Sequence, residues 1–302
     1  MSVHWLNGTT GYLPGAVNVG VVRLDGETVL LIDSGLDEDR ARKVLNALER
    51  EGLRPAVLFL THAHADHMGG ARFLKRRTGV QIIAPSGEAD FIRRPYLEPF
   101  ALYGLADPPS ELRSKFLMAE SVEVDVETDE GPWSPVPDGP SLTVIGLAGH
   151  SPWQCGLTLG GVCFCGDALF PAQLWDKHGF IYHADISRCF STFDRLAELA
   201  PDILVPAHGE PAEPGDGLIE TNRRQLKAAS DEVLDAVRET ARTRAGTEDI
   251  LAVLADRWGV DFRGLIDFSL ARATLNAHLV YLEQAGAVKC RGEGGHLLWL
   301  PV

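Results

Sequence analysis

Four side chains that can bind a metal ion occur within six residues of one another. They are His62, His64, Asp66 and His67. Residues 56–60, shortly before them, form a wholly apolar segment that is typical of a strand buried on both faces. Because burying a polar group without a partner costs about 1–3 kcal/mol, such a cluster is costly in a purely structural loop. A bound cation replaces this cost with coordination energy, and imidazole and carboxylate suit zinc and neighbouring first-row metals.

The spacing within this cluster resembles the metallo-β-lactamase superfamily, whose signature H-x-H-x-D-H is followed by a distant histidine, aspartate and histidine. In this chain the later positions are His150, Asp167 and His208, each at the expected end of a strand. The resemblance covers roughly residues 15–212, and the motifs are specific when taken together. It implies an α/β protein with the αββα sandwich of that superfamily.

The resemblance also implies a centre with two divalent metal ions, for which Zn²⁺ is expected and Mn²⁺ or Fe²⁺ are the alternatives. The implied ligands of the first ion are His62, His64 and His150. Those of the second ion are Asp66, His67 and His208, and Asp167 bridges the two ions. Such a ligand count leaves room for a bridging hydroxide that attacks a carbonyl or phosphoryl group, as a catalytic site requires. Asp66 and Asp167 are therefore the expected catalytic carboxylates.

Three small residues and one large one accompany these motifs. Asp33 matches the superfamily's first motif and is expected to orient the histidine loop, although it could instead only form a turn before Gly35. Ser34 and Thr61 are expected to support that loop by hydrogen bonds. Many hydrolases of the superfamily have glycine where this chain has Trp153, a departure that leaves ligation by His150 intact.

Alternating strands and helices must position these residues. Hydrophobic periodicity predicts strands over 19–24, 28–33, 56–60, 80–84, 142–147 and 157–165, and helices over 37–51 and 69–78. Residues 93–140 hold eight of the 18 prolines and are interpreted as an insertion, with a helix over 111–119 and a strand over 122–127. The insertion and the loop 171–185 are the expected pocket walls. In that loop Tyr182 and His183 either assist a developing charge or only pack.

The character of the chain changes after a linker over 211–217, so we predict a catalytic domain over 1–212 and a second domain over 217–302. Helices over 222–245, 248–257 and 269–285, followed by a glycine-turned hairpin, predict a winged-helix-like domain. It is similar to the extension of a superfamily branch that includes a mitochondrial endoribonuclease. Residues 217–302 hold eleven Lys and Arg against twelve Asp and Glu, without the basic excess that phosphate binding requires. We therefore expect a cleft wall or a homodimer contact, with nucleic-acid binding as the alternative.

The bulk composition limits partners and location. The chain has 302 residues and a formal net charge of −14, which argues against a broad basic surface for nucleic acid or an anionic membrane. It shows no signal-peptide pattern and no apolar run of about 18 residues, so no transmembrane helix is expected. The five cysteines show no disulfide framework. Cys163 and Cys165 are expected as buried thiols on one strand face, and the expected location is cytoplasmic.

These observations predict a metal-dependent hydrolase of an ester, thioester, lactone or related small substrate. Two alternatives stay open: an endoribonuclease or nucleic-acid-binding metallo-hydrolase, and a mononuclear iron enzyme of the persulfide dioxygenase type. The superfamily runs many reactions on one scaffold, so the fold and the metal ligands do not choose among them.

Overall fold

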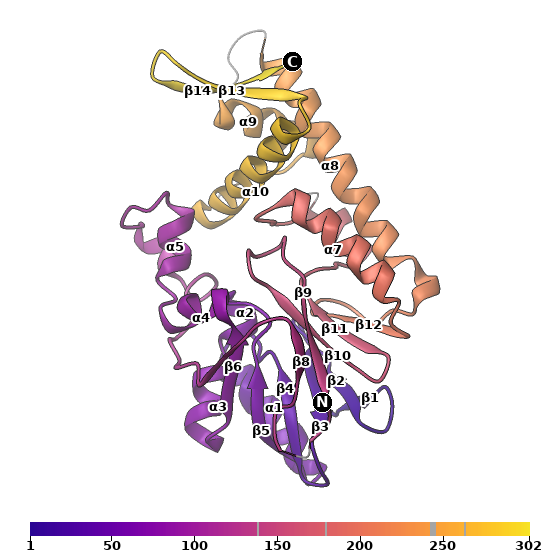
Figure 1. Ribbon diagram of the computed structural model, residues 1–302. Helices are drawn as coiled ribbons and strands as arrows, with labels where there is room; N and C mark the ends of the chain where they lie inside the picture. Colours follow the sequence, from indigo (N-terminus) through magenta and orange to yellow (C-terminus); the bar gives the residue numbers. More distant parts are fainter. Residues whose placement is uncertain (138, 179, 242–245, 263) are drawn as a thin grey trace.

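The computed structural model describes residues 1–137, 139–178, 180–241, 246–262 and 264–302. Two β-sheets pack face to face, and helices cover their outer faces (Figure 1). Further helices and a hairpin from the C-terminal part of the chain lie at one end of this sandwich (Figure 1). The predicted α/β sandwich is confirmed.

The first sheet has seven strands in chain order. They are β1 (His4–Trp5), β2 (Thr10–Leu13), β3 (Val19–Arg23), β4 (Thr28–Ile32), β5 (Arg54–Phe59), β6 (Gln81–Pro85) and β7 (Val126–Thr128). Neighbours from β1 to β4 are antiparallel, and neighbours from β4 to β7 are parallel, with helices in the connections. The four strands predicted in this part of the chain are confirmed.

The second sheet has five strands and is antiparallel except between β11 and β12. In spatial order they are β12 (Ile203–Pro206), β11 (Val162–Gly166), β10 (Cys155–Leu159), β9 (Leu142–Gly146) and β8 (Gly131–Trp133). Residues 157–165 were predicted as one regular run, but they belong to two strands. Gly160 and Gly161 have φ angles of 54° and 80°, a left-handed backbone that turns the chain between β10 and β11.

The core between the sheets is built from the inward faces of both. Phe59 of the first sheet and Leu157 of the second belong to this apolar cluster. Along β11, Phe164 points into it, whereas Cys163 and Cys165 point to the opposite face and pack beneath α7. This alternation confirms that the two thiols are buried on one face of the strand.

Helices complete the outer layers and the connections. They are α1 (Glu38–Arg50), α2 (Ala65–Met68), α3 (Ala71–Thr78), α4 (Ser86–Arg93), α5 (Leu97–Leu102), α6 (Ala172–His178) and α7 (Ile186–Leu199), with short 3₁₀ turns η1 (Ser110–Arg113) and η2 (Pro214–Asp216). The α1 helix begins after Asp37, whose carboxylate accepts a hydrogen bond from the Arg40 amide, and its Val44 and Leu48 are buried against the first sheet. The predicted helices over 37–51 and 69–78 are confirmed.

The predicted helix over 111–119 is wrong. Only η1 is helical there, and it ends at Arg113, because the backbone of the next residue, Ser114, is extended (φ −76°, ψ 161°). Leu112 and Leu117 are both buried in a cluster with Leu102 and apolar residues of the C-terminal part, so tertiary packing decides the path of this segment. Of the predicted strand over 122–127, only the residues from Val126 onward form a strand, β7, although the burial alternates as predicted.

The C-terminal part contains α8 (Leu218–Thr240), α9 (Thr247–Trp258), α10 (Leu265–Gln284) and the hairpin of β13 (Val288–Glu293) and β14 (His296–Pro301). The three predicted helices are present, and residues 242–245 of the first lie outside the described residues. Val237, Leu275 and Trp299 share a core within this part. In the described ranges, no helix has both the length and the hydropathy needed to cross a membrane.

His278 is a buried polar contact between α8 and α10. It is 1% exposed, its Nδ1 lies 2.9 Å from the Ser230 hydroxyl, and its ring stacks on Phe180. Burial, with a smaller effect from His183, lowers the pKa of His278 to about 3. The folded state therefore holds this imidazole in its neutral form.

We expect His278 to make folding sensitive to acid. Because the ordinary pKa of histidine is near ~6.5, the unfolded chain takes up this proton first as the pH falls, and stability is lost between pH about 6.5 and about 3. The unfolding temperature, measured by circular dichroism, should decrease less in His278→Gln than in the wild type when the pH is lowered from 7.5 to 5. His4→Gln, at an exposed histidine, serves as the control and should follow the wild type. An unchanged pH dependence in His278→Gln would contradict this role.

Candidate metal centre

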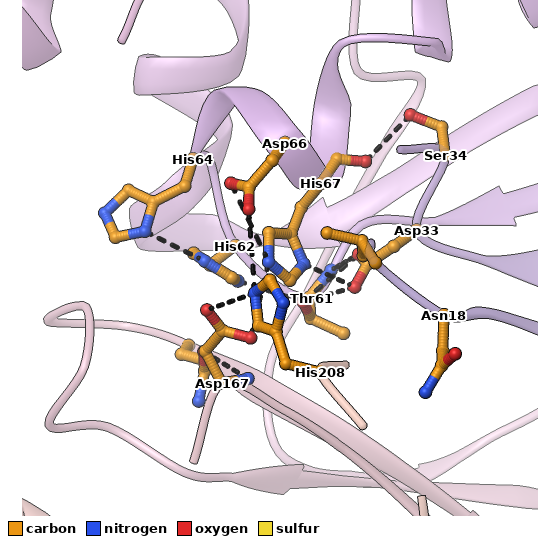
Figure 2. A network of polar contacts seen from close by, with 12 residues as sticks. Asn18, Asp33, Ser34, Thr61, His62, His64, Asp66, His67, Asp167 and His208 are labelled. Atoms are coloured by element: carbon orange, nitrogen blue, oxygen red, sulfur yellow. Dashed lines mark hydrogen bonds and ion pairs between the residues drawn. The ribbon is translucent and has the colours of Figure 1, made fainter. Parts of the chain in front are cut away.

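The ends of four strands carry the candidate ligands to one edge of the sandwich. The loop and short helix after β5 carry His62, His64, Asp66 and His67. The segments after β9, β11 and β12 carry His150, Asp167 and His208. The structure brings all seven side chains together, and Figure 2 shows six of them labelled around a common point.

Three histidines form the first group. The Nδ1 atom of His64 lies 3.0 Å from Nε2 of His62 and 2.9 Å from Nε2 of His150. His62 is fully buried and His150 nearly so. Three imidazole nitrogens therefore converge within bonding reach of a single cation, the arrangement predicted for the first ion.

A second group adjoins the first through Asp167. His208 Nε2 lies 3.6 Å from Asp66 Oδ2 and 3.5 Å from Asp167 Oδ2. His67 Nε2 lies 3.9 Å from Asp66 Oδ1 and 3.4 Å from Asp167 Oδ1. Asp167 Oδ2 also lies 3.3 Å from His150 Nε2, so this carboxylate stands between the two groups.

Two atoms of the cluster show that a cation fits it. His67 Nε2 and Asp167 Oδ1 are both buried, and neither has a hydrogen-bond partner among the described residues. An unsatisfied buried polar atom costs about 1–3 kcal/mol, and a charged one costs more. A cation between these atoms would satisfy both, so the donor set fits the metal site typical of this fold.

The outer nitrogens of the histidines are held by other groups. Nδ1 of His67 lies 2.8 Å from Asp33 Oδ2, and Nδ1 of His150 lies 2.9 Å from the backbone oxygen of Tyr182. Nδ1 of His208 lies 2.7 Å from the backbone oxygen of Ala16. Because each outer nitrogen donates to an oxygen, Nε2 is the atom that faces the cluster, and in the neutral ring it offers its lone pair there.

Asp33 supports the histidine loop from the end of β4. Its carboxylate accepts hydrogen bonds from the Thr61 amide (2.8 Å) and the Thr61 hydroxyl (2.9 Å) in addition to His67 (Figure 2). Its φ of 63° is a left-handed conformation that costs energy for a residue with a Cβ. Ser34 extends the support, since its hydroxyl donates to the His67 carbonyl at 2.7 Å.

Sequence reasoning missed Glu88, which links the two loops of the first histidine group. This carboxylate is 3% exposed and accepts hydrogen bonds from the Ala63 amide (3.0 Å), the Trp153 amide (3.2 Å) and the Ser151 hydroxyl. Burial raises its pKa even though these donors oppose the shift. Ala63 precedes His64 and Ser151 follows His150, so Glu88 fixes one ligand loop against the other.

Burial and the charges of neighbouring side chains shift the pKa values of the cluster in opposite directions. Burial lowers the pKa of His62 and His150 well below the ordinary value, which keeps both imidazoles neutral. Burial would also lower the pKa of His67, but the carboxylates of Asp167, Asp33 and Asp66 together outweigh it and the pKa is raised well above its ordinary value. Burial would raise the pKa of Asp167, but the histidines, His208 first, outweigh it and hold that pKa well below its usual range. Asp167 is therefore a buried anion that favours a nearby cation.

An inner cavity of about 510 Å³ opens on the cluster and is bordered by His64, Asp66, His150 and Asp167. Tyr182 lines it, with its ring 5.5 Å from the rings of both His64 and His150. His183, which was expected to be either a pocket residue or a packing residue, is not among the residues that border this cavity. Its side chain is 1% exposed behind His150, in contact with Cys189 and Trp175, because successive side chains of this extended segment point to opposite sides.

The family model of the metallo-beta-lactamase superfamily matches residues 12–208 of the chain. The chain is similar to two hydroxyacylglutathione hydrolases. That of Serratia proteamaculans is 26% identical over 204 residues, which cover 64% of this chain and 67% of that protein. That of Dechloromonas aromatica is 27% identical over 180 residues, which cover 60% of this chain and 53% of that protein. The chain is also similar to hydroxyacylglutathione hydrolase GloC of Haemophilus influenzae, at 27% identity over 197 residues (64% of this chain and 85% of that protein). The chain thus matches about two thirds of the length of the Serratia protein and about half of the length of the Dechloromonas protein.

Two solved structures are similar along nearly the whole chain. A beta-lactamase domain protein from Burkholderia ambifaria has a TM-score of 0.71 at 22% identity, covering 99% of this chain and 93% of that one. A metallo-beta-lactamase family protein from Thermus thermophilus has a TM-score of 0.71 at 21% identity, covering 99% and 100%. At this identity the likeness shows the fold, and it includes the C-terminal helices.

The chain belongs to the metallo-beta-lactamase superfamily. With its histidine and aspartate cluster at the edge of the sandwich, it is a metallo-β-lactamase-like hydrolase.

Glu88→Ala should weaken metal binding by about 10–100-fold, the usual effect of removing a group that orients metal ligands. Two backbone amides and a hydroxyl lose their acceptor, which lets the loops of His64 and His150 move apart. Glu88→Gln keeps one carbonyl oxygen and should have a smaller effect. Competition with a chromogenic chelator measures the affinity, and Glu198→Ala at an exposed glutamate is the control.

The unfolding temperature of the metal-free variants separates this effect from misfolding. Wild-type metal affinity in a folded Glu88→Ala protein would contradict the positioning role.

Proposed function

We propose that the chain is a metal-dependent thioester hydrolase whose cluster binds two divalent cations, with Zn²⁺ preferred. The observation that carries the proposal is the convergence of seven imidazole and carboxylate side chains beside the inner cavity, two of them with buried ligand atoms that lack hydrogen bonds within the described residues. The three relatives named as hydroxyacylglutathione hydrolases support a thioester over a lactone or phosphoester substrate.

The proposed ligands of one cation are His62, His64 and His150. Those of the other are Asp66, His67 and His208, with Asp167 shared between them. When bound, the cations would polarise the scissile carbonyl and lower the pKa of the attacking water. The ligand roles require the inward nitrogens to be unprotonated, and Asp33 holds the Nδ1 proton of His67 on the outer side of the ring, which leaves Nε2 as the ligand atom once a cation displaces its proton.

Tyr182 is the proposed donor to the charge that develops in the reaction. Its side chain lines the inner cavity and packs against the rings of His64 and His150. Burial raises the pKa of Tyr182, with a smaller effect from Glu98 and Glu88, so the phenol keeps its proton at neutral pH. A protonated hydroxyl aimed at the reacting group stabilises an oxyanion or a thiolate leaving group.

We also propose that the C-terminal part is winged-helix-like and serves as a wall of the substrate site. Three helices followed by a hairpin support the first statement, as does the antiparallel bridge between Gly246, just before α9, and Leu298 of β14. Arg272 and Asn276 of α10 line a cavity next to the cluster, which supports the second. A small-molecule substrate follows from this arrangement better than nucleic acid does.

Asp167→Ala should remove metal and activity together, because this carboxylate lies within 3.5 Å of ligand atoms from both groups. We expect less than one equivalent of metal per chain and a loss of turnover of about a hundredfold or more. Mass spectrometry of metal content and a thioester assay measure the two effects. Asp90→Ala, at an exposed aspartate, is the control. Two bound metals with wild-type turnover in Asp167→Ala would refute the shared-ligand assignment.

The substrate class is tested with matched thioesters, oxygen esters, lactones and phosphodiesters at fixed metal concentration. We expect kcat/KM to be highest for a thioester, to vanish with a chelator and to return when Zn²⁺ is added back. Preference for a phosphodiester would contradict the thioester proposal. Oxygen uptake with one bound iron would instead support the persulfide dioxygenase alternative.

A further inference from the structure

A second cavity of about 890 Å³ adjoins the inner one. We call it the outer cavity. Both cavities are lined by His64, Glu98 and Tyr182, so they meet beside the cluster. Helices α4 and α5, the segment after His150 and the C-terminal part contribute its walls. Its volume falls in the range of small-molecule sites, which lets one ligand extend from the cluster into the outer cavity.

Trp153 is the aromatic residue that departs from the family pattern, and it lies in the wall of this cavity. Trp153 is 48% exposed, and its indole sits on the backbone of Gly87 in α4. A Cβ at position 87 would lie 2.1 Å from the Trp153 Cγ, so the indole can occupy this place only because residue 87 is glycine. Phe91 of the same helix adjoins the indole, with ring centroids 6.4 Å apart.

The lining favours an uncharged apolar group over an anion. Apolar side chains, among them Phe91, Leu102 and Leu297, line the cavity together with the indole. Among the lining residues that the structure describes, four are acids and one is an arginine. That residue, Arg272, already donates to the Leu102 carbonyl at 3.1 Å. A glutathionyl group carries two carboxylates and one ammonium group, so it is a net anion that would meet mainly acids there.

We infer that the outer cavity is a subsite for an uncharged aromatic or long aliphatic group of the substrate, and that Trp153, seated on Gly87, is its specificity-determining residue. This inference rests on the proposed function, since the group in the outer cavity belongs to the thioester that is cleaved at the cluster. It assigns the chain a substrate class different from the glutathione thioesters in its relatives' names.

Binding tests the subsite without any turnover. The uncharged fluorescent probe N-phenyl-1-naphthylamine is titrated into the metal-loaded full-length protein. Trp153→Ala should weaken binding about tenfold, since it removes a large aromatic contact area. Gly87→Ala should weaken it comparably while keeping the indole in the chain, because the added methyl group displaces Trp153. Leu199→Ala, an exposed apolar side chain outside the cavity lining, should bind like the wild type. Wild-type affinity in both Trp153→Ala and Gly87→Ala would overturn the inference.

Kinetics test the substrate class. Two acetyl thioesters with methyl and naphthyl thiol groups are compared with S-acetylglutathione. We expect the wild type to prefer the naphthyl compound by about tenfold in kcat/KM and Trp153→Ala to lose that preference. A preference of the wild type for the glutathione compound would overturn the subsite. So would a preference for the naphthyl compound that is unchanged in Trp153→Ala. Neither result would contradict the proposed thioester hydrolase activity. If no thioester is cleaved by any form, the proposed function fails, and the probe titration decides the subsite alone.

Discussion

The arrangement of this protein depends on placing ionisable side chains where water does not reach them. His67 and Asp167 each bury a polar atom that has no hydrogen bond within the described part of the chain, and the two atoms lie 3.4 Å apart. Without a cation, burying these groups costs free energy, and the protein alone offsets that cost only by protonating His67, whose imidazolium then pairs with the Asp167 carboxylate. A cation removes that penalty, so metal binding and stability of this region should be coupled. Four strand ends converge on this point, and the surrounding contacts keep it assembled.

Two buried carboxylates, Asp33 and Glu88, hold the histidine loop in place by hydrogen bonds. Asp33 holds Thr61 and His67 from the end of β4, at the cost of a left-handed backbone. Glu88 holds Ala63 from α4 and ties it to the segment that follows His150. The same α4 carries Gly87, on which Trp153 rests. The support of the cluster and the wall of the outer cavity are therefore parts of one element. We expect substitution of Glu88 to affect metal binding and substitution of Gly87 to affect substrate preference.

The sequence predicted best what depends on local spacing. The ligand cluster and the strands that end at it follow from short motifs, and Asp33 follows from its own motif before Gly35. Glu88 could not be found this way, because its partners lie 25 to 65 residues away and no pattern marks a lone glutamate after a strand. Tyr182 and His183 are neighbours in the chain but face opposite sides, which depends on the path of a loop. The helix expected over 111–119 failed because Leu112 and Leu117 pack against the C-terminal part.

Anomalous diffraction from metal-loaded crystals, recorded above and below the absorption edge of each candidate metal, tests the central claim most directly. The account predicts two peaks per chain, one among the ligand nitrogens of His62, His64 and His150 and one among the ligand atoms of Asp66, His67 and His208, with Asp167 between them. The edge at which the peaks appear identifies the metal, and zinc is expected. No peak at the cluster, or one iron peak confined to the first group, would contradict a two-metal hydrolytic centre.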